Sequence, residues 1–374
     1  MEKIFSRIGI TILSSLGLGS TYGAVDQILN SNFFLNPAEL SLIKKLQLLE
    51  GNVVITPKLE FKGITPLGQG RVTSRVEDFI PYLLSGFRFT NKFVGGITIT
   101  PSAYGHIEWP MHSIVREAST TTKLFYYRLG AQSSYQLSEK LAVGVGINLE
   151  YNKRGELDFI VPNMGNQINK MSGLNCTGDL GIYYKINSRN FLTAAIYTGV
   201  NTYGRGTSSL GNTSVHNFYL NIIEAPVAFI GLQHRWSDKL LTEGKLYWSG
   251  WSLEKNVNFK NKTTGSTILP ANWSDIWSFQ TNLRYAITDK LALLNSLIYE
   301  TNPAPVSTNA IGYPLSGSGS LSVGLDLMLL KNFSSQVIYS YGRFIPHARI
   351  NSGGSKGEII GNFQAAVIQF TYKT

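Results

Sequence analysis

Long stretches of this chain alternate, residue by residue, between apolar side chains and polar or small ones. In residues 141–151, LAVGVGINLEY, every second position from Leu141 to Tyr151 is apolar. The same alternation recurs in KLFYYRLGAQSSYQL (123–137), SFQTNLRYAI (278–287) and SLSVGLDLMLL (320–330). A period of two places neighbouring side chains on opposite faces of a β-strand. These stretches therefore predict strands with one apolar and one polar face, as in a transmembrane barrel or a one-sided soluble sheet.

The spacing of turn residues separates these two alternatives. Each short break lies between two alternating strands, as a tight hairpin does; the breaks are at 90–92, 138–140, 187–190, 237–239, 288–290 and 331–332. Longer connections rich in Gly, Ser, Asn and Thr separate these hairpins, at 62–76, 104–118, 153–172, 203–216, 255–272, 301–316 and 345–359. The pattern predicts an all-β fold, a transmembrane antiparallel β-barrel of about fourteen strands with both chain ends on the short-turn side.

The N-terminus has the pattern of an export signal. Lys3 and Arg7 precede the apolar stretch 8–19, IGITILSSLGLG, and small or polar residues follow it. We predict that residues 1–24 are a signal peptide. A membrane anchor is the alternative, but a spanning helix needs roughly 20 apolar residues. Because no run of 18 apolar residues follows, the exported chain is either soluble outside the inner membrane or a barrel of an outer membrane.

Composition excludes several other classes of protein. The single cysteine, Cys176, rules out an intramolecular disulfide framework and a cysteine-rich metal site. The five histidines lack metal-ligand spacing, so we expect no metal and no cofactor. An exported chain rarely meets nucleic acid, so its net charge of +10 indicates a solvated surface or attraction to lipid phosphates and anionic solutes. Ser318 lies in SGSGS without the strand-turn-helix setting of a hydrolase, so we expect no enzyme activity.

Residues 25–46, VDQILNSNFFLNPAELSLIKKL, precede the first strand, which we predict at 49–61. The segment is apolar enough to need burial, and a closing barrel can bury it in the lumen as a plug. Pro37 fixes its own backbone and disfavours the helical conformation at Asn36, whose side chain can bond nearby backbone. We predict that 25–46 are an N-terminal hatch, with 47–374 as the barrel; a passive turn at Asn36-Pro37-Ala38 is the alternative.

Over almost its whole length the chain resembles the long-chain fatty acid outer-membrane transporter family (FadL type). The resemblance rests on NPAEL (36–40), YWSGWS (247–252), YETNPAPV (299–306) and YSYGRF (339–344). It implies a fourteen-stranded barrel in the outer membrane of a Gram-negative bacterium. Such a barrel carries hydrophobic solutes, long-chain fatty acids first, past the hatch and out through a sideways opening near the third strand. The expected partners are that solute, outer-membrane lipid and the barrel-assembly machinery, and we expect a monomer.

The chain departs from the expected pattern in three places. A hatch of 25–46 is short, and the loop at 153–172 is modest for a family that often builds its first ligand groove from long loops. The third departure is from bacterial barrels in general, many of which end in an aromatic residue where this sequence has Thr374. A diffusion porin for small polar solutes shares every barrel feature and is the alternative function. The apolar segment ahead of the barrel favours the transporter over this porin.

Candidate residues for the sideways opening lie in the third strand, FVGGITITPSAYG (93–105). Gly95 and Gly96 weaken a strand, and Pro101 lacks the backbone donor of a ladder hydrogen bond. These three residues predict a kink or gap in the wall. An ordinary bend or strand end is the alternative.

Candidate ligands for a solute carboxylate are cations on the polar faces of the predicted strands: Arg88, Arg128, Lys245 and Arg284. We prefer Arg128 and Arg284, which lie nearest mid-strand, because a guanidinium can hold a carboxylate with two parallel hydrogen bonds. Four carboxylates, Glu150, Asp179, Glu243 and Asp326, share the same faces. The alternative is therefore a network of lumenal charges that satisfies itself.

Overall fold

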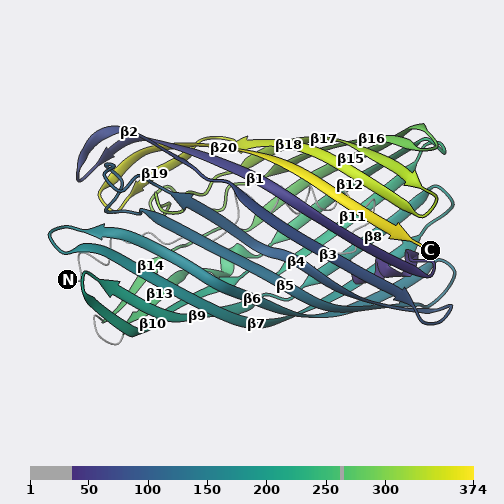
Figure 1. Cartoon of the computed structure of the whole chain (residues 1–374), viewed down its shortest axis with the longest axis horizontal. Coiled ribbons are helices and arrows are strands. Elements are labelled where there is room, and N and C mark those ends of the chain that lie inside the picture. Colours follow the sequence, from purple (N-terminus) through teal and green to yellow (C-terminus); the bar gives the residue numbers. More distant parts are fainter. Residues whose placement is uncertain (1–35, 262–264) are drawn as a thin grey trace.

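The computed structural model describes residues 36–261 and 265–374, and these residues form one closed barrel (Figure 1). Its strands are antiparallel, and β1 closes the wall by pairing with β20 from Gln47↔Lys373 to Ile64↔Lys356. The predicted signal peptide and residues 25–35 of the predicted hatch lie outside the described residues. No helix in the described part of the chain is long and apolar enough to cross a membrane.

Among the described residues the wall has fourteen barrel strands, as predicted. Breaks divide some of them, so twenty strand segments are found. In chain order these are β1 (Leu46–Thr65), β2 (Gly68–Arg75), β3 (Asp78–Arg88), β4 (Phe93–Glu108), β5 (Thr121–Gln136), β6 (Leu141–Val161), β7 (Gly165–Lys185), β8 (Asn190–Tyr197), β9 (Val200–Leu210), β10 (Thr213–Glu224), β11 (Val227–Arg235), β12 (Leu240–Ser249), β13 (Asn256–Asn261), β14 (Gly265–Pro270), β15 (Ile276–Thr288), β16 (Leu291–Glu300), β17 (Ser318–Leu330), β18 (Phe333–Phe344), β19 (Ala348–Ser352) and β20 (Ser355–Lys373). Two 3-10 helices accompany them, η1 (Pro37–Leu42) and η2 (Trp251–Leu253).

The alternation in the sequence corresponds to the two faces of the wall. On β6, Asn148 and Glu150 point inward and are fully buried, whereas Val145 and Ile147 are 53% and 66% exposed on the outside. An exposed apolar band on a barrel is the surface that meets lipid chains. The period-two pattern was therefore a correct indicator of both the strands and their orientation.

The six short turns lie where the sequence places them, at the end of the barrel that holds the C-terminus (Figure 1). The opposite end differs from the prediction. Strands β1 and β2 meet at a turn of residues 66–67, β9 and β10 at 211–212, and β19 and β20 at 353–354. Much of the sequence predicted as long loops is therefore strand. These strand ends extend past the apolar band, where neither face must be apolar, so alternation disappears although pairing continues.

Apolar side chains line much of the interior. One cluster, in the half remote from the short turns, includes Phe159, Leu220, Trp251, Trp273 and Tyr313. The rings of Trp251 and Trp273 pack edge to face, with their centres 5.5 Å apart. A second cluster, on β1, β3 and β20, surrounds the residues that follow Asn36. The lumen therefore holds apolar surface above and around the N-terminal segment.

The orientation of the barrel gives a first prediction. Single cysteines placed at Asn261 or Ser352, in a Cys176→Ser background, should react with a membrane-impermeant thiol reagent on intact cells. Cysteines at Lys140 or Lys239 should not react, because those positions lie in short turns that we expect to face the periplasm. Labelling of the second pair and protection of the first would refute this topology.

Candidate functional site

Asn36 holds the start of η1 against the inner wall of the barrel. Its amide nitrogen donates hydrogen bonds to the carbonyl oxygen of Ile182, at 2.8 Å, and to the hydroxyl of Thr193, at 2.7 Å. Its amide oxygen accepts from the backbone N–H of Ala38 at 2.9 Å, and Pro37 occupies the first turn. Asn36, Pro37 and Ala38 are all buried. Asn36 therefore caps the N-terminus of η1 and also anchors η1 to the barrel wall.

Two glycines make room for this anchor. Gly144 on β6 and Gly181 on β7 lie directly opposite each other in the ladder. A Cβ atom on Gly181 would lie 1.9 Å from the amide oxygen of Asn36, and one on Gly144 would lie 2.2 Å from the backbone nitrogen of Ala38. No side chain fits at such distances, so the backbone of the motif lies directly on the wall. Sequence reasoning missed this seat, although glycine at inward positions of two neighbouring strands was a visible signal.

The rest of the segment is held by β3 and β4. A Cβ on Gly86 would meet the side chain of Ile43 at 2.3 Å, and one on Gly96 would meet Leu40 at 3.3 Å. Arg88 donates from Nε to the carbonyl oxygen of Ile43 at 2.8 Å and from another nitrogen to that of Ser41. Arg88 therefore binds the end of the N-terminal segment, and Gly96 makes room for Leu40.

The other three candidate cations also have partners. Arg128 forms an ion pair with Glu150 and lies 3.5 Å from Glu224. The central carbon of its guanidinium lies 4.7 Å from the centre of the Tyr197 ring. Lys245 pairs with Glu243 at 3.1 Å, and Arg284 with Asp326 at the same distance. Arg128 and Arg284 lie on β5 and β15, which are not neighbouring strands. These contacts favour the alternative of a self-satisfying network, and a carboxylate site at these cations stays a prediction.

The ladder between β3 and β4 covers only part of the two strands. Their ladder begins at Arg88↔Val94 and ends at Leu83↔Ile99. Beyond that point β4 keeps its ladder with β5 on its other side, and a bulge at Ser102 shifts the register of the β4–β5 ladder. Pro101 lies two residues past the last β3–β4 pair. Gly95 and Gly96 lie within the regular β3–β4 ladder, opposite Phe87 and Gly86, so they do not mark its end.

Side chains bridge the two strands beyond the end of this ladder, in a region that we call the β3–β4 seam (residues 74–82 and 100–108). Asp78 accepts a hydrogen bond from the hydroxyl of Tyr104 at 2.8 Å and lies 2.6 Å from Nδ1 of His106. The other ring nitrogen of His106 lies 2.9 Å from Glu108, whose backbone N–H donates to Ser74 at 3.0 Å. The seam therefore carries polar side-chain contacts in place of a β-ladder.

These contacts also show how β4 is bent. Tyr104 pairs with Phe125 and His106 with Lys123, and Phe125 and Lys123 occupy outward-facing positions of β5. Tyr104 and His106 would therefore face outward in a regular sheet, yet both side chains are buried. Tyr104 and His106 both contact Asp78, which occupies an inward-facing position of β3. Its neighbour Phe79 is 63% exposed on the outside, and successive residues of a strand face opposite sides. The part of β4 beyond its ladder with β3 is therefore displaced toward the lumen relative to β3. A bulge next to a proline that lacks a ladder donor accounts for this inward bend.

Ser318 and His347 have separate partners. Ser318 donates its hydroxyl hydrogen to Glu300 at 3.0 Å, while His347 lies on the surface and pairs with Glu358 at 3.4 Å. In the described part of the chain no group of three or more His, Cys, Asp or Glu residues is arranged to hold a metal ion.

A closed barrel with an apolar outer band and an N-terminal segment seated in its lumen defines an outer-membrane transport barrel. The family model described as outer membrane protein transport protein (OMPP1/FadL/TodX) matches residues 9–367, and the chain belongs to this family. The resemblance inferred from the motifs is thereby confirmed. The family comprises transport proteins rather than enzymes, and its members lie in the outer membrane of Gram-negative bacteria.

Solved structures show the same fold at low sequence identity. A Pseudomonas aeruginosa FadL homologue superposes with a TM-score of 0.84 at 14% identity, covering 98% of this chain and 99% of its own. The P. putida toluene transporter TodX gives 0.73 at 16% identity, covering 97% of this chain and 96% of its own. The Ralstonia pickettii toluene transporter TbuX gives 0.70 at 14% identity, covering 100% and 98%. No curated protein sequence matches the chain.

Proposed function

We propose that this barrel carries hydrophobic small molecules across the outer membrane, with long-chain fatty acids as the first candidate solute and monoaromatic hydrocarbons as the second. The observation that carries this proposal is the N-terminal segment, which lies against Gly144 and Gly181 and is held by hydrogen bonds to Ile182 and Thr193, below an apolar lumen lining. Apolar lining suits a solute that leaves water at the outer end. Membership in the family and the toluene transporters among the similar structures support the same class of solute.

In this proposal residues 25–46 act as the hatch and the solute leaves sideways through the β3–β4 seam. A ladder hydrogen bond is hard to open inside a membrane, because neither backbone group finds another partner in lipid. The seam lacks such bonds beyond Leu83↔Ile99 and is bridged by side chains that can change rotamer. Pro101 and the bulge at Ser102 are the local cause, and Gly96 supports the hatch instead.

A diffusion porin is the competing function, and conductance separates the two. Purified barrels in planar bilayers should stay closed, because the seated segment occupies the lumen, while cells that express the barrel should take up fatty acid or toluene faster than cells that lack it. Mass spectrometry of the purified barrel should find a bound lipophilic molecule. A large, steady open channel without accelerated uptake would instead establish a porin.

A ligand-binding assay on the purified barrel tests the polar end of the solute. Replacing Arg128 and Arg284 by Gln should weaken fatty acid binding more than binding of a neutral hydrocarbon of similar length. Breaking a buried ion pair costs about 3–5 kcal/mol, so Arg128→Gln alone would also destabilise the barrel. The matched variant Arg128→Gln with Glu150→Gln removes both charges of the closer pair. Because Glu224 also loses its contact with Arg128, barrel assembly is measured in every variant. Equal losses for both ligands would remove these arginines from the solute site.

A further inference from the structure

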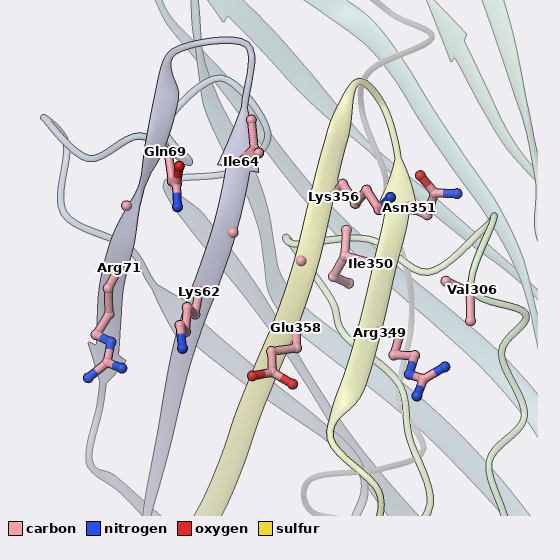
Figure 2. A pocket seen from close by; sticks show the side chains of 13 residues that line it. Lys62, Ile64, Gln69, Arg71, Val306, Arg349, Ile350, Asn351, Lys356 and Glu358 are labelled. Carbon is pink, nitrogen blue, oxygen red and sulfur yellow. The ribbon is translucent and has the colours of Figure 1, made fainter.

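Cations cluster on the outside of the barrel near the β1–β2 and β19–β20 hairpins. Across four adjacent strands the register places Arg71 opposite Lys62, Lys62 opposite Glu358, and Glu358 opposite Arg349. Figure 2 shows these four side chains on neighbouring strands, along an open groove of about 870 Å³. Lys356 and Asn351 lie on the hairpin side of this row (Figure 2). Three of the four residues in the row are therefore positively charged.

A second row lies on the same face, nearer the middle of the barrel. Lys58 is opposite both Arg75 and Asn362, and Asn362 is opposite Arg343. All three cations are exposed. We call the two rows together the cationic patch, made of Lys58, Lys62, Arg71, Arg75, Arg343 and Arg349.

The protein balances the charges of the patch only in part, because six cations share this face with Glu60 and Glu358. Lys62 and Arg71, and likewise Lys58 and Arg75, are like charges directly opposite each other, an arrangement that destabilises a sheet. Arg71 pairs with Glu60 at 3.1 Å, but within residues 36–261 and 265–374 no ion pair engages the other five cations. An external anion between the strands would relieve this repulsion.

The position of the patch relative to the apolar band identifies where that anion comes from. On β18 the outward residues Val337, Tyr339 and Tyr341 are 45%, 52% and 44% exposed, and Arg343 is the next outward residue. Two residues span about 7 Å of strand, and the outer row lies four residues farther, about 13 Å along the strand. The lipid headgroup layer on each side of a membrane is roughly 5–8 Å deep. The row of Lys58, Arg75 and Arg343 therefore lies at headgroup level, and the row of Lys62, Arg71 and Arg349 lies directly above it.

We propose that the cationic patch binds the phosphorylated headgroup of a glycolipid in the outer leaflet. Two rows of cations at different heights match a ligand with several phosphates on a sugar scaffold, and arginine guanidinium groups hold phosphate oxygens in pairs. A phosphate bound between Lys62 and Arg71 offsets their repulsion, so lipid binding stabilises this edge of the wall, where β1 meets both β2 and β20. The inference rests on the orientation with the six short turns in the periplasm, which cysteine labelling tests separately.

The experiment uses the full-length barrel in phosphatidylethanolamine nanodiscs, with diphosphorylated lipid A added, with dephosphorylated lipid A added, or with inorganic phosphate in the buffer. The variant carries Lys58→Ser, Lys62→Ser, Arg343→Ser and Arg349→Ser. Its matched control loses four exposed cations at the short-turn end, through Lys140→Ser, Lys185→Ser, Arg189→Ser and Lys239→Ser. Both variants have the same net charge, and all eight positions are exposed, so folding is expected to persist.

Diphosphorylated lipid A should raise the unfolding midpoint of the wild type and of the control, and the shift should shrink at high salt. The patch variant should lose the shift, since each cation removed near a membrane surface lowers affinity roughly fivefold. An equal shift in the patch variant, or an equal shift with dephosphorylated lipid A, would overturn the proposal. A shift reproduced by inorganic phosphate alone would show that the patch binds a small anion and not a lipid.

Discussion

Replacing Gly181 by Ala should unseat the Asn36-Pro37-Ala38 segment and lower solute uptake while the barrel still assembles. The new methyl carbon would lie 1.9 Å from the amide oxygen of Asn36, so the side chain must leave the wall. Asn36 then loses the hydrogen bonds to Ile182 and Thr193. Losing these two hydrogen bonds costs about 3 kcal/mol, which shifts the equilibrium between the seated and the unseated segment roughly a hundredfold.

Two comparisons make this prediction specific. Gly178→Ala, on the same strand, is the matched control, because its methyl carbon would meet only ordinary contacts at 3.7 Å and 3.9 Å. Asn36→Ala with Pro37→Ala should lower uptake as Gly181→Ala does. Because both changes remove the same contact, combining them should add little further loss. Additive losses would show that Gly181 and the motif act through different contacts. Normal uptake in the Asn36 and Pro37 variant, with normal assembly, would make the motif a passive turn.

Deleting Ser102 and replacing Pro101 by Val should close the β3–β4 seam and reduce uptake to the level of cells that lack the barrel. Ser102 is the extra residue of the bulge, since Pro101 is opposite Tyr127 and Ala103 is opposite Tyr126. Its deletion leaves the β4–β5 register intact and removes the cause of the inward bend. Valine restores the backbone donor that Pro101 lacks, so β4 can extend its ladder along β3.

A second bulge supplies the control. On β17, Met328 is opposite Ser334 and Leu330 is opposite Phe333, so Leu329 is the extra residue there. Deleting Leu329 should change assembly no more than deleting Ser102 does and should leave uptake intact, because this bulge lies beside a short turn and far from the seam in the chain. Heat-modifiable electrophoretic mobility reports assembly in both variants. Undiminished uptake with a closed seam would move the solute path elsewhere in the barrel.

The β-barrel was predictable because its signals are local. Alternation of period two in β5, β6, β15 and β17 reflects the difference between lipid outside and polar groups inside, and each strand reports that difference in its own residues. The short turns are equally local, since a tight hairpin depends on a few consecutive residues. The predicted boundaries of the long loops were wrong for the same reason. Where a strand extends beyond the membrane, both of its faces meet water, so its residues no longer alternate between apolar and polar.

The pairing of residues far apart in the chain required the tertiary structure. Asn36 lies 146 positions before Ile182, yet its anchor depends on that carbonyl and on the absence of a side chain at Gly181. Arg88, Arg128, Lys245 and Arg284 look alike in a strand pattern, whereas their partners differ: backbone carbonyls for Arg88 and carboxylates for the others.

The residue pattern of the strands determined that this chain is a barrel, how many strands it has and which face of each strand meets lipid. Which inward residues support the N-terminal segment, where the wall lacks a ladder and which cations lack a partner were decided by strand register in the closed barrel. Register joins residues across neighbouring strands and is set by closure of the whole sheet, so no single strand contains the information that specifies it.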